Sequence, residues 1–465
     1  MNAPLVGQAL RRVEARSKVT GATRYASDRL PHGCAHAALV TATAAKGRIT
    51  AIDTGAARRV PGVLHVMTHE ERRPAIHPVV LEMELTFGRR THEDMPPLQG
   101  AEIHYSGQVV AMVTAETACH AASLVTVAYQ AEPSTVVPDF AAALPGAIHI
   151  PKVKGEDTDQ VHGDPETELA ASACVVDALY TTPAEHHAAM ELHAKVAEWQ
   201  GDGLVMHEAT QWVRGTGRAL AQALGVPDDK VRLLNPFVGG GFGGKAYFRY
   251  DSALCAIAAR DLGRPVKLVL SREQVFVLGG ARPATRQRLA LGADASGRLR
   301  AVIHDSWTAV STVDTNYQET CGYQTRQLYA TRALRTTHRV VPFDIASTCP
   351  MRAPGSGPGS FALESAMDKL ACRLGIDPVE LRLRNYAEQE PGTGRPFSPK
   401  HLRDCYAIAA ERINWPSRSP RPGARPRAIG WSGWAWRRRA TMSCSSRRAP
   451  RWRCCATGRR GSRRP

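Results

Sequence analysis

The chain has 465 residues and a formal net charge of +17, and its length suits two or three domains. The charge is concentrated at one end: residues 418–465 hold 15 arginines and no lysine or acidic residue, so residues 1–417 carry only +2. This near-neutral body gives no argument for a basic face that would bind nucleic acid on the folded domains. No apolar run is long enough to span a bilayer, and we expect no secretory signal at the N-terminus.

The eleven cysteines are isolated in the sequence, apart from the adjacent Cys454 and Cys455. No CxxC pair and no metal-type spacing occurs, so the sequence predicts neither an iron–sulfur cluster nor a structural zinc in this chain. Scattered single cysteines favour a reducing compartment, and we therefore predict a cytoplasmic location.

The first predicted unit, up to about residue 130, alternates strands with short helices. Apolar runs bounded by turn residues predict strands over 49–52, 63–67, 108–113 and 125–129. A small alanine-rich helix separates the first two strands, and a second helix is expected over 116–124. This mixture predicts a compact α+β unit.

Residues 132–168 are rich in proline, glycine and acidic residues, and we predict that they form a linker rather than a packed element. A larger second unit begins near Ala170. Its first predicted elements are strands over 175–180, 195–198 and 204–206 and a helix over 214–224 that ends at Gly225.

The most distinctive stretch is Gly239–Lys245, which reads GGGFGGK between a predicted strand (231–238) and a predicted helix (252–262). Its five glycines leave room for backbone N–H groups to close on a bulky anionic ligand. The stretch also satisfies a phosphate-binding P-loop except at the last position, where Ala246 replaces the serine or threonine that holds Mg²⁺. A tight turn without a ligand is the third interpretation.

Three later predicted helices carry clear local signals. Asp251 and Ser252 are expected to cap the helix after the glycine stretch. A later helical pattern, which follows the sequence MRAPG, has apolar residues on one face. These are Phe361, Met367, Leu370 and Leu374. Asp377 and Pro378 then begin another short helix.

The last part of the chain differs in character from the rest. Residues 417–465 contain four of the eight tryptophans and three of the eleven cysteines, with no acidic residue and no apolar period. Such usage is typical of an out-of-frame reading of a GC-rich gene, and we hypothesise that roughly the last 30 to 45 residues are a frameshift product. The alternative is a functional basic arm that binds nucleic acid through its arginines.

Seven stretches of the chain form a consistent set. They are KVTGATRYASD (18–28), AKGRITAIDTGAARRVPGV (45–63), YSGQVVAMVTAET (105–117), ATQWVRG (209–215), NPFVGGGFGGK (235–245), MRAPG (351–355) and DPVELRLRN (377–385). Together and in this order, they resemble the molybdopterin-binding large subunit of the xanthine dehydrogenase and aldehyde oxidase family. The likeness is greatest to the bacterial, aldehyde-oxidising type.

The resemblance implies an α+β fold in which an N-terminal hammerhead domain precedes the first part of a molybdopterin-binding domain. The implied divisions are a hammerhead domain over 16–131, a linker over 132–168, the first part of the molybdopterin-binding domain over 169–416 and an arginine-rich, non-native tail over 417–465.

The resemblance also implies which residues contact the molybdenum cofactor. Gln211 matches a glutamine that hydrogen-bonds toward the oxo and pterin groups; a glutamine that satisfies strand-end backbone groups is the alternative. The loop against the cofactor corresponds to Gly240, Gly241, Phe242 and Gly243. Arg352 and Ala353 match a cofactor-contacting segment that lines the substrate pocket. A buried arginine paired with Glu364 is the alternative there.

Two departures from the family pattern bear on the substrate. Xanthine-oxidising members carry a glutamate where this chain has Ala246, and a phenylalanine where it has Pro354. With Arg352, these positions belong to the implied substrate pocket. The resemblance therefore favours an aldehyde or an N-heterocycle over xanthine.

In the family, a molybdenum-bound hydroxide derived from water attacks the substrate carbon, and a hydride passes to a molybdenum-bound sulfido group. A glutamate near the C-terminus of the full-length subunit is the base. Electrons leave for iron–sulfur and FAD-containing partner subunits. No residue of this chain matches that glutamate, so we expect a C-terminally truncated relative that is inactive by itself. The alternative is a non-catalytic remnant that binds the iron–sulfur and FAD subunits as a scaffold.

The resemblance leaves finer points open. The cytosine dinucleotide is one form that the pterin could take, and co-export with a partner subunit would place the complex in the periplasm instead of the cytoplasm. His186, His187 and His193 lie near Glu185 and Glu191 in the sequence, but their spacing fits no zinc pattern, so we assign no metal site.

Overall fold

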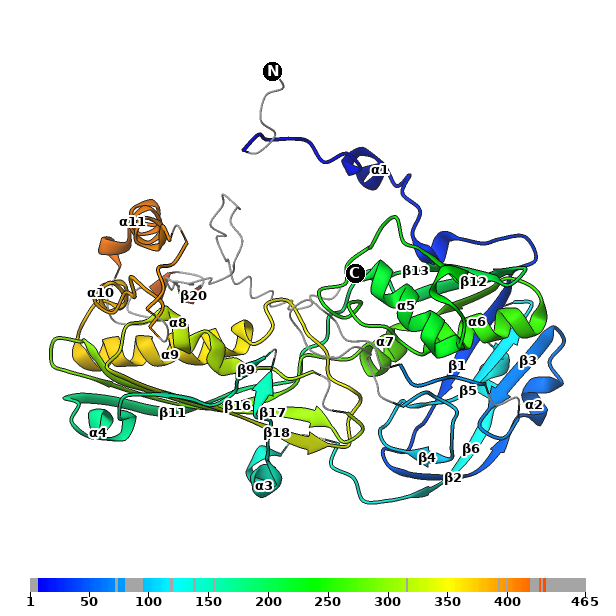
Figure 1. Cartoon of the computed structure of the whole chain (residues 1–465), viewed down its shortest axis with the longest axis horizontal. Helices are drawn as coiled ribbons and strands as arrows, with labels where there is room; N and C mark the ends of the chain where they lie inside the picture. Colours follow the sequence, from blue (N-terminus) through cyan, green and yellow to red (C-terminus); the bar gives the residue numbers. More distant parts are fainter. Residues whose placement is uncertain are drawn as a thin grey trace, which may run out of the picture.

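The structure is a computed structural model that contains two layered bodies side by side (Figure 1), each built on one large sheet. It describes residues 7–71, 74–79, 95–117, 120–136, 139–153, 155–314, 317–391, 394–398, 400–418, 426–427 and 430–431. The helical and strand content agrees with the predicted α+β class.

The larger sheet joins strands from both predicted units. Its strands are β1 (Ala35–Thr41), β3 (Val63–Thr68), β5 (Val109–Ala115), β12 (Ala194–Gln200), β13 (Gly203–Glu208), β14 (Val231–Leu234) and β15 (Val266–Val269). The seven strands run in the order β14-β13-β12-β15-β1-β5-β3. β1 and β15 meet in parallel, with Ala35 opposite Val266. The first unit is therefore completed by strands from much later in the chain.

Two helices, α5 (Val213–Leu224) and α6 (Asp251–Leu262), belong to this body (Figure 1). α6 is buried along residues 251–259, because it packs on β12 and β15 and lies beside α5. Each helix ends at a glycine in the left-handed region, Gly225 at φ 66° and Gly263 at φ 60°. Both helices were predicted from the sequence, as were the glycines that end them, and the structure confirms these predictions.

A small sheet completes the first unit. It consists of β2 (Gly47–Asp53), β4 (Glu102–Ile103) and β6 (Thr126–Ala131), in the order β4-β2-β6, with α2 (Gly55–Arg58) following β2. The predicted strands and the small helix are all present. Of the helix expected over 116–124, Glu116 and Thr117 are not helical, residues 118–119 lie outside the described residues, and His120–Leu124 forms a short 3₁₀ helix.

The second body is built on a six-stranded sheet. Its strands are β7 (Ile148–His149), β10 (Gln160–His162), β11 (Cys174–Thr182), β16 (Thr285–Ala293), β17 (Leu299–Ser311) and β18 (Ala333–Phe343). They run in the order β10-β18-β17-β16-β11, with β7 also paired to β18. Helix α9 (Ser356–Leu374) covers one face and α4 (Pro165–Ala170) lies on the other (Figure 1).

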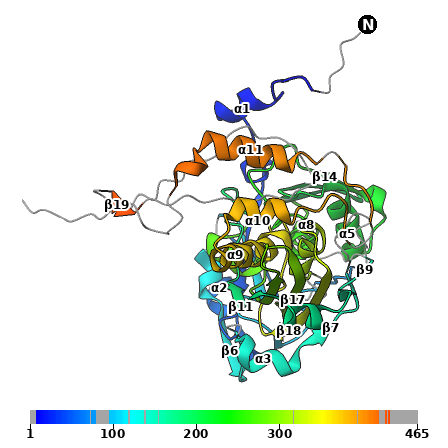
Figure 2. The ribbon, with the colours of Figure 1, turned by 90° about the vertical axis from the view of Figure 1, so that its left-hand side faces the viewer.

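Helix α9 confirms most of its predicted apolar face. Met367 and Leu370 are buried in the core of this body, but Phe361 is 49% exposed and meets the ring of Tyr180 edge-on. α10 (Pro378–Arg384) begins as predicted, because the Asp377 carboxylate accepts the N–H groups of Val379 and Glu380. Figure 2 shows α10 and then α11 (Leu402–Arg412) stacked outside α9.

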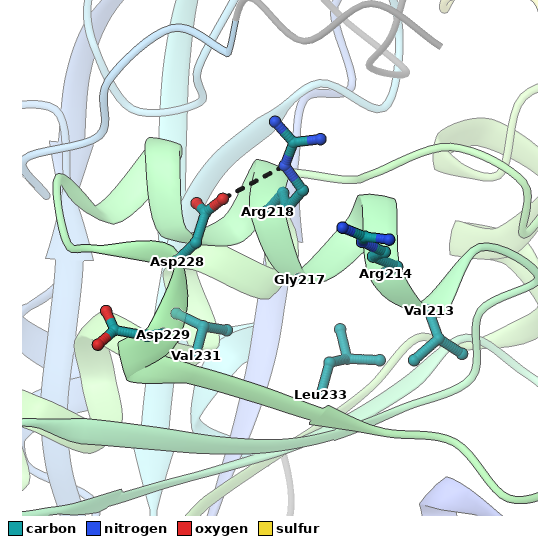
Figure 3. Close-up of a pocket in the computed structure, with 8 residues that line it drawn as sticks. All are labelled: Val213, Arg214, Gly217, Arg218, Asp228, Asp229, Val231 and Leu233. Atoms are coloured by element: carbon teal, nitrogen blue, oxygen red, sulfur yellow. Dashed lines mark hydrogen bonds and ion pairs between the residues drawn. The ribbon is translucent and has the colours of Figure 1, made fainter. Parts of the chain in front are cut away.

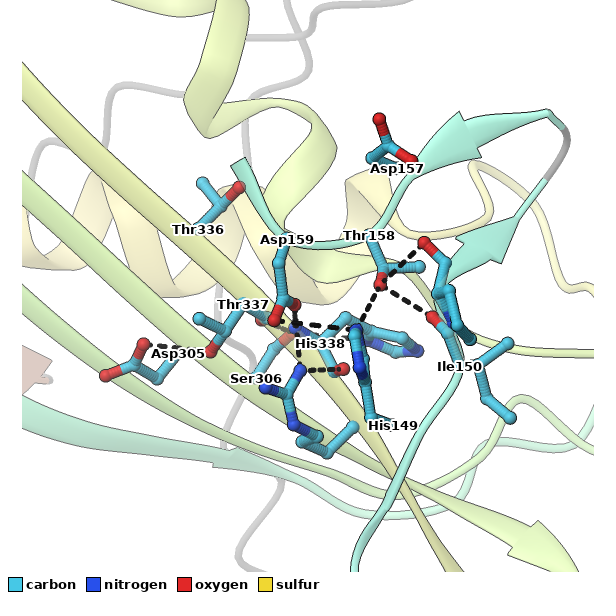
Figure 4. A network of polar contacts seen from close by, with 12 residues as sticks. His149, Ile150, Asp157, Thr158, Asp159, Asp305, Ser306, Thr336, Thr337 and His338 are labelled. Atoms are coloured by element: carbon cyan, nitrogen blue, oxygen red, sulfur yellow. Dashed lines mark hydrogen bonds and ion pairs between the residues drawn. The ribbon is translucent and has the colours of Figure 1, made fainter. Parts of the chain in front are cut away.

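Residues 132–168, predicted to be an unpacked linker, are bound to the second sheet through β7, β10 and α4. Figure 4 shows the contacts: the Asp159 carboxylate accepts hydrogen bonds from the His338 backbone N–H (3.1 Å) and the Arg339 guanidinium (2.8 Å). The Thr158 hydroxyl donates to the Ile150 carbonyl at 2.6 Å. Composition predicted a linker rather than a packed element, but hydrogen bonds and strand pairing hold much of this stretch against the sheet.

Two local predictions near the glycine stretch are wrong. The strand expected over 231–238 ends at Leu234, and the following residues form a loop. Asp251 and Ser252 do not cap α6, because the Asp251 carboxylate pairs with buried Lys195 and the Ser252 hydroxyl donates to Glu208 (2.8 Å). These two side chains point into the core instead.

The remaining α-helices and strands are short. They are α1 (Ala15–Val19), α3 (Phe140–Ala143), α7 (Arg272–Leu278), α8 (Thr325–Leu328), β8 (Lys152–Val153), β9 (Glu156–Asp157), β19 (Pro426–Arg427) and β20 (Gly430–Trp431). In the described part of the chain, none of the helices combines the length and apolar character needed to cross a bilayer. The predictions for the arginine-rich tail fall, from residue 419 onward, almost wholly outside the described residues.

Candidate functional site

The glycine stretch forms a compact loop between β14 and α6. Gly240 (φ 99°), Phe242 (φ 55°) and Gly243 (φ 113°) all lie in the left-handed region. A Cβ on Gly243 would overlap the carbonyl oxygen of Pro350, and one on Gly241 would overlap the Gln211 side chain. These glycines are therefore required by the protein's own packing, while Gly240 has only side-chain atoms near it, at 3.2 Å and beyond.

Lys245, the lysine of the near-P-loop, is not available to a phosphate. Its ammonium group is buried and donates to the Glu191 carboxylate at 2.7 Å and to the Glu191 carbonyl at 3.0 Å. Burial lowers the pKa of Lys245, and its hydrogen bond to Glu191 opposes that effect. The same carboxylate accepts the Gly239 N–H at 2.7 Å. The nucleotide-phosphate interpretation thus loses its lysine as well as its hydroxyl.

Gln211 holds the loop in place. Its side-chain oxygen accepts the N–H groups of Gly243 (2.9 Å) and Lys245 (3.3 Å), and its backbone N–H donates to the Lys245 carbonyl (2.7 Å). The alternative role, a glutamine that satisfies backbone groups, is therefore present in the structure. Gln211 is also exposed, so the residue lies at the surface beside the loop.

The segment Met351–Gly355 lies against the glycine loop. The Arg352 backbone N–H donates to the Phe242 carbonyl at 2.8 Å, which brings the two predicted cofactor segments together. The Arg352 side chain is exposed, and Ala353 adopts φ 63°. Pairing between Arg352 and Glu364 is excluded, because Glu364 binds Arg382 (2.7 Å) and Tyr329 (2.8 Å) instead.

The surface of this loop fits an oxygen-rich or anionic group. The N–H groups of Gly240, Gly241 and Phe242 donate no hydrogen bond within the described part of the chain, and the Arg352 guanidinium has no acceptor there. Phe242 is 47% exposed beside them. Free peptide donors, an exposed cation and an aromatic side chain suit the phosphate, oxo and ring groups of a pterin cofactor.

The two predicted substrate-pocket positions lie at the edges of this site. Ala246 donates its N–H to the Gly243 carbonyl (3.0 Å) and is half-buried, directly after the loop. Pro354 is half-buried in the turn that precedes α9. The structure thus brings Gln211, residues 240–243 and 351–354 into one neighbourhood.

Several of the nearby histidines and acids are bonded to other protein groups. His187 is bonded to the Pro350 carbonyl (2.9 Å), Glu185 to Arg282 (2.6 Å) and Glu191 to Lys245. Burial lowers the pKa of His187. No group of three or more potential ligands gathers among the described residues.

A separate groove of about 600 Å³ lies between α5 and β14 (Figure 3). It is lined by Val213, Arg214, Gly217, Arg218, Asp228, Asp229, Val231 and Leu233. Its lining holds two arginines and two aspartates, and one pair of them, Arg218 and Asp228, forms an ion pair at 3.3 Å. None of the predicted site residues lines it, so size alone does not identify the functional region.

Two family models cover most of the described chain. The family described as "Molybdopterin cofactor-binding domain" matches residues 149–386, and "Aldehyde oxidase and xanthine dehydrogenase, a/b hammerhead domain" matches residues 20–133. The chain belongs to the molybdopterin-binding subunits of the xanthine dehydrogenase and aldehyde oxidase family. This family consists of molybdenum-dependent oxidoreductases, so the family prediction is confirmed.

Curated relatives agree with this family. The aldehyde oxidoreductase molybdenum-binding subunit PaoC of Escherichia coli K12 is 37% identical over 427 residues, which are 90% of this chain and 56% of PaoC. The nicotine 6-hydroxylase large subunit of Paenarthrobacter nicotinovorans is 29% identical, over 84% of this chain and 49% of that protein. The chain thus spans about half the length of the curated relatives it matches.

Solved structures share the fold. Quinoline 2-oxidoreductase from Pseudomonas putida 86 superposes with a TM-score of 0.77 at 24% identity, covering 88% of this chain and 54% of that one. The aldehyde oxidoreductase from Desulfovibrio gigas gives a TM-score of 0.73 at 26% identity, covering 87% and 46%. The predicted order of a hammerhead domain followed by molybdopterin-binding sequence is confirmed.

Sequence reasoning missed the structural importance of Glu191. It was considered only as a neighbour of three histidines, whereas the structure places its carboxylate under the glycine loop, where it binds Lys245 and Gly239. A lysine within a glycine-rich, buried loop needs an acidic partner, and that requirement was the available signal. The sequence did not show which acid, distant in the chain, would pair with Lys245.

Proposed function

We propose that this chain contributes the glycine loop and the 351–355 turn to the cofactor site of a molybdenum oxidoreductase that acts on an aldehyde or an N-heterocycle. The observation that carries the proposal is the juxtaposition of free peptide N–H groups at residues 240–242 with the unpaired guanidinium of Arg352. Family membership supplies the identity of the ligand, a molybdopterin.

When bound, the cofactor supplies water-derived oxygen to the substrate and accepts two electrons. The chain's own residues then have positioning and electrostatic roles. Gly240, Gly241 and Phe242 donate peptide N–H groups to ligand oxygens. Arg352 holds an anionic or carbonyl oxygen at the rim, and Gln211 keeps the loop in the geometry that presents these donors.

The substrate class follows from the small residues at two positions. Ala246 and Pro354 offer neither a carboxylate nor an aromatic ring to grip a purine. Relatives whose names specify an aldehyde oxidoreductase and a nicotine hydroxylase support an aldehyde or N-heterocycle. We further propose iron–sulfur and FAD partner subunits, since relatives are named as subunits, together with a cytosine dinucleotide pterin and a cytoplasmic location, or a periplasmic one by co-export.

The 465-residue polypeptide by itself is proposed not to turn over substrate. No residue of the sequence matches the family's base, and the aligned part is 56% of the relative PaoC. Substrate oxidation by this polypeptide with bound molybdenum would contradict this part of the proposal.

The test is molybdenum and pterin content after production in a host that makes the cofactor. Wild-type protein is expected to retain both, and Arg352→Ala to lose them by roughly tenfold, because a charge-assisted contact is removed. Arg412→Ala, an exposed arginine at the end of α11, serves as the control and is expected to match wild type.

Equal cofactor content in the Arg352 and Arg412 variants would argue against the proposed role of Arg352. A wild-type protein that carries no molybdenum but co-purifies with iron–sulfur or FAD subunits would favour the scaffold alternative. The two results are separated by elemental analysis and by the composition of the purified complex.

A further inference from the structure

Arg282 lies buried behind the 351–355 turn, with 7% of its surface exposed. One end of its guanidinium donates to the carbonyls of Met351 (2.8 Å) and Arg352 (2.5 Å). Another nitrogen donates to the Glu185 carboxylate at 2.6 Å, and the third forms an ion pair with Glu319 at 3.3 Å. A single side chain therefore binds two consecutive peptide carbonyls and two acids.

Glu319 completes the contact from the other side of the turn. It is fully buried, and one carboxylate oxygen accepts the Gly355 N–H at 2.6 Å. Its other oxygen accepts the hydroxyl of Tyr317, which is itself buried. Arg282 and Glu319 thus hold the first and last residues of the same turn and are paired with each other.

The turn needs this support because its own backbone is strained. Ala353 adopts φ 63°, in the left-handed region that is unfavourable for a residue other than glycine. No strand pairing covers residues 351–355, which lie outside every sheet. Fixed carbonyls at 351 and 352 therefore set the direction in which the Arg352 side chain leaves the backbone.

Arg282 is itself held rigidly. Its backbone exchanges two hydrogen bonds with Glu185, at 2.9 and 3.1 Å, in an isolated bridge. Its neighbour Ala281 accepts the Cys349 N–H at 3.0 Å, just before the turn. The Arg352 N–H of this turn donates to the Phe242 carbonyl of the glycine loop. Displacement of Arg282 would therefore shift both cofactor segments.

We propose that Arg282 and Glu319 are positioning residues, which fix the 351–355 turn so that Arg352 and the glycine loop present a preorganised surface to the cofactor. This proposal rests on the proposed function and deepens it. Neither residue touches the ligand surface, since both are buried behind the turn. Their effect is transmitted through the backbone of residues 351, 352 and 355.

The chain contains a matched control for a buried arginine. Arg382, 2% exposed, donates to the Glu364 carboxylate (2.7 Å), the Asp368 carboxylate (2.8 Å) and the Pro378 carbonyl (2.9 Å). It joins α10 to α9 within the second body and touches neither cofactor segment. Arg282→Lys and Arg382→Lys therefore remove comparable networks at two different places.

The experiment uses the full 465-residue protein and two measurements. Amide hydrogen exchange, followed by mass spectrometry over residues 349–357, measures how rigidly the turn is held. The pterin and molybdenum content measures how well the cofactor surface binds its ligand. Arg282→Lys is expected to accelerate exchange in this segment roughly tenfold and to lower pterin per folded protein by a similar factor. Arg382→Lys is expected to accelerate exchange over residues 378–385 alone, with pterin content unchanged.

Glu319→Gln is the conservative variant, because an amide oxygen still accepts the Gly355 N–H while the charge facing Arg282 is lost. It is expected to retain more pterin than Glu319→Ala, a graded rescue that general destabilisation does not produce. If either variant fails to fold, Arg282→Lys still decides the question.

Unchanged exchange over 349–357 in Arg282→Lys, or identical pterin loss in Arg282→Lys and Arg382→Lys, would overturn the proposal. A wild-type protein without pterin is a failure of the proposed function, and exchange of the turn then decides the positioning role alone. The two failures are thereby distinguishable.

Discussion

Two buried lysines, Lys245 in the glycine loop and Lys195 in β12, are neutralised in different ways. Lys245 has one acidic partner, Glu191, whose carboxylate also accepts a loop N–H. Lys195 lies beside Asp251 and Glu208, and Arg249 is 3.7 Å from Asp251, so two cations face two acids. The first arrangement fixes a loop, whereas the second joins β12, β13 and the start of α6.

The difference has an electrostatic consequence. Around Lys195, burial, reinforced by the charge of Asp251, raises the pKa of Glu208 to about 7. The pKa of Asp251 lies below its usual value, because Lys195 and Arg249 outweigh the effect of burial. The cluster under α6 therefore contains a carboxyl group that changes its charge near neutral pH. The comparison teaches that one cation paired with one acid can fix the conformation of a loop. A cluster of several charges can instead join two strands to the start of a helix.

The largest effect is expected from Lys195→Met. It leaves Asp251 buried with only the more distant Arg249 to balance it, and removing one partner of a buried ion pair costs about 5 kcal/mol at the upper end. Urea unfolding is the measurement. Lys230→Met, which breaks the exposed pair with Asp202, is the control and should leave the midpoint almost unchanged. Similar midpoints for the two variants would remove the basis of the comparison.

Lys245→Met is expected to cost about 3 kcal/mol, the lower end for a buried pair, because Glu191 still accepts the Gly239 N–H. The distinguishing result is pterin content, which should fall further than in Lys195→Met when both are expressed per folded protein. Full pterin retention in Lys245→Met would contradict the view that this pair serves the loop.

Glu208 gives a pH dependence of stability. Its folded pKa of about 7 exceeds the ordinary 4.5, so its contribution is fully present below pH 4.5 and is lost as pH rises through 7. The loss is on the order of 3 kcal/mol at 1.36 kcal/mol per pKa unit. Glu208→Gln should make the free energy of unfolding less dependent on pH between 4.5 and 7. The contribution of Asp251 falls only below its ordinary pKa of 3.8. Unfolding free energies measured from pH 4.5 to 8 test this, and identical slopes would exclude it.

The smallest effect is expected from Gly240→Ala. An alanine at Gly263, φ 60°, costs about 1–2 kcal/mol, and no atom lies within 4 Å of the new methyl group. At Gly240, φ 99°, the methyl group would also meet Phe242 at 3.2 Å and Ala189 at 3.3 Å, so Gly240→Ala should lower the thermal midpoint somewhat more than Gly263→Ala. Gly240→Ala should also lose pterin, whereas Gly263→Ala should not, because the Gly240 N–H belongs to the proposed cofactor loop. Equal pterin content in both variants would place Gly240 outside the site.

Local signals predicted much of the fold. The strands around residues 63–67 and 108–113 and the ends of α5 and α6 at Gly225 and Gly263 were all correct, because apolar runs and C-terminal glycines act over a few residues. The pairing of β1 with β15 was not predictable in this way, since Ala35 and Val266 have no shared local pattern.

The candidate site was predicted less evenly. The motifs led to Gln211, residues 240–243 and Arg352, and the structure brings these together; their role toward the cofactor remains a prediction. Asp251 was wrongly predicted as a helix cap, because its pairing with Lys195 overrides the local preference. Arg282 and Glu319 gave no sequence signal at all, since each is a single charge in an unremarkable context.

The parallel pairing of β1 with β15 also constrains the order of folding. During synthesis, β1 has its neighbour β5 early, but its other edge stays open until residue 269 has left the ribosome. A fragment that stops after the hammerhead sequence would keep that edge exposed, with its unpaired N–H and C=O groups available to another chain. The hammerhead unit can thus be delimited in the sequence, but its sheet is completed only when later strands fold beside it.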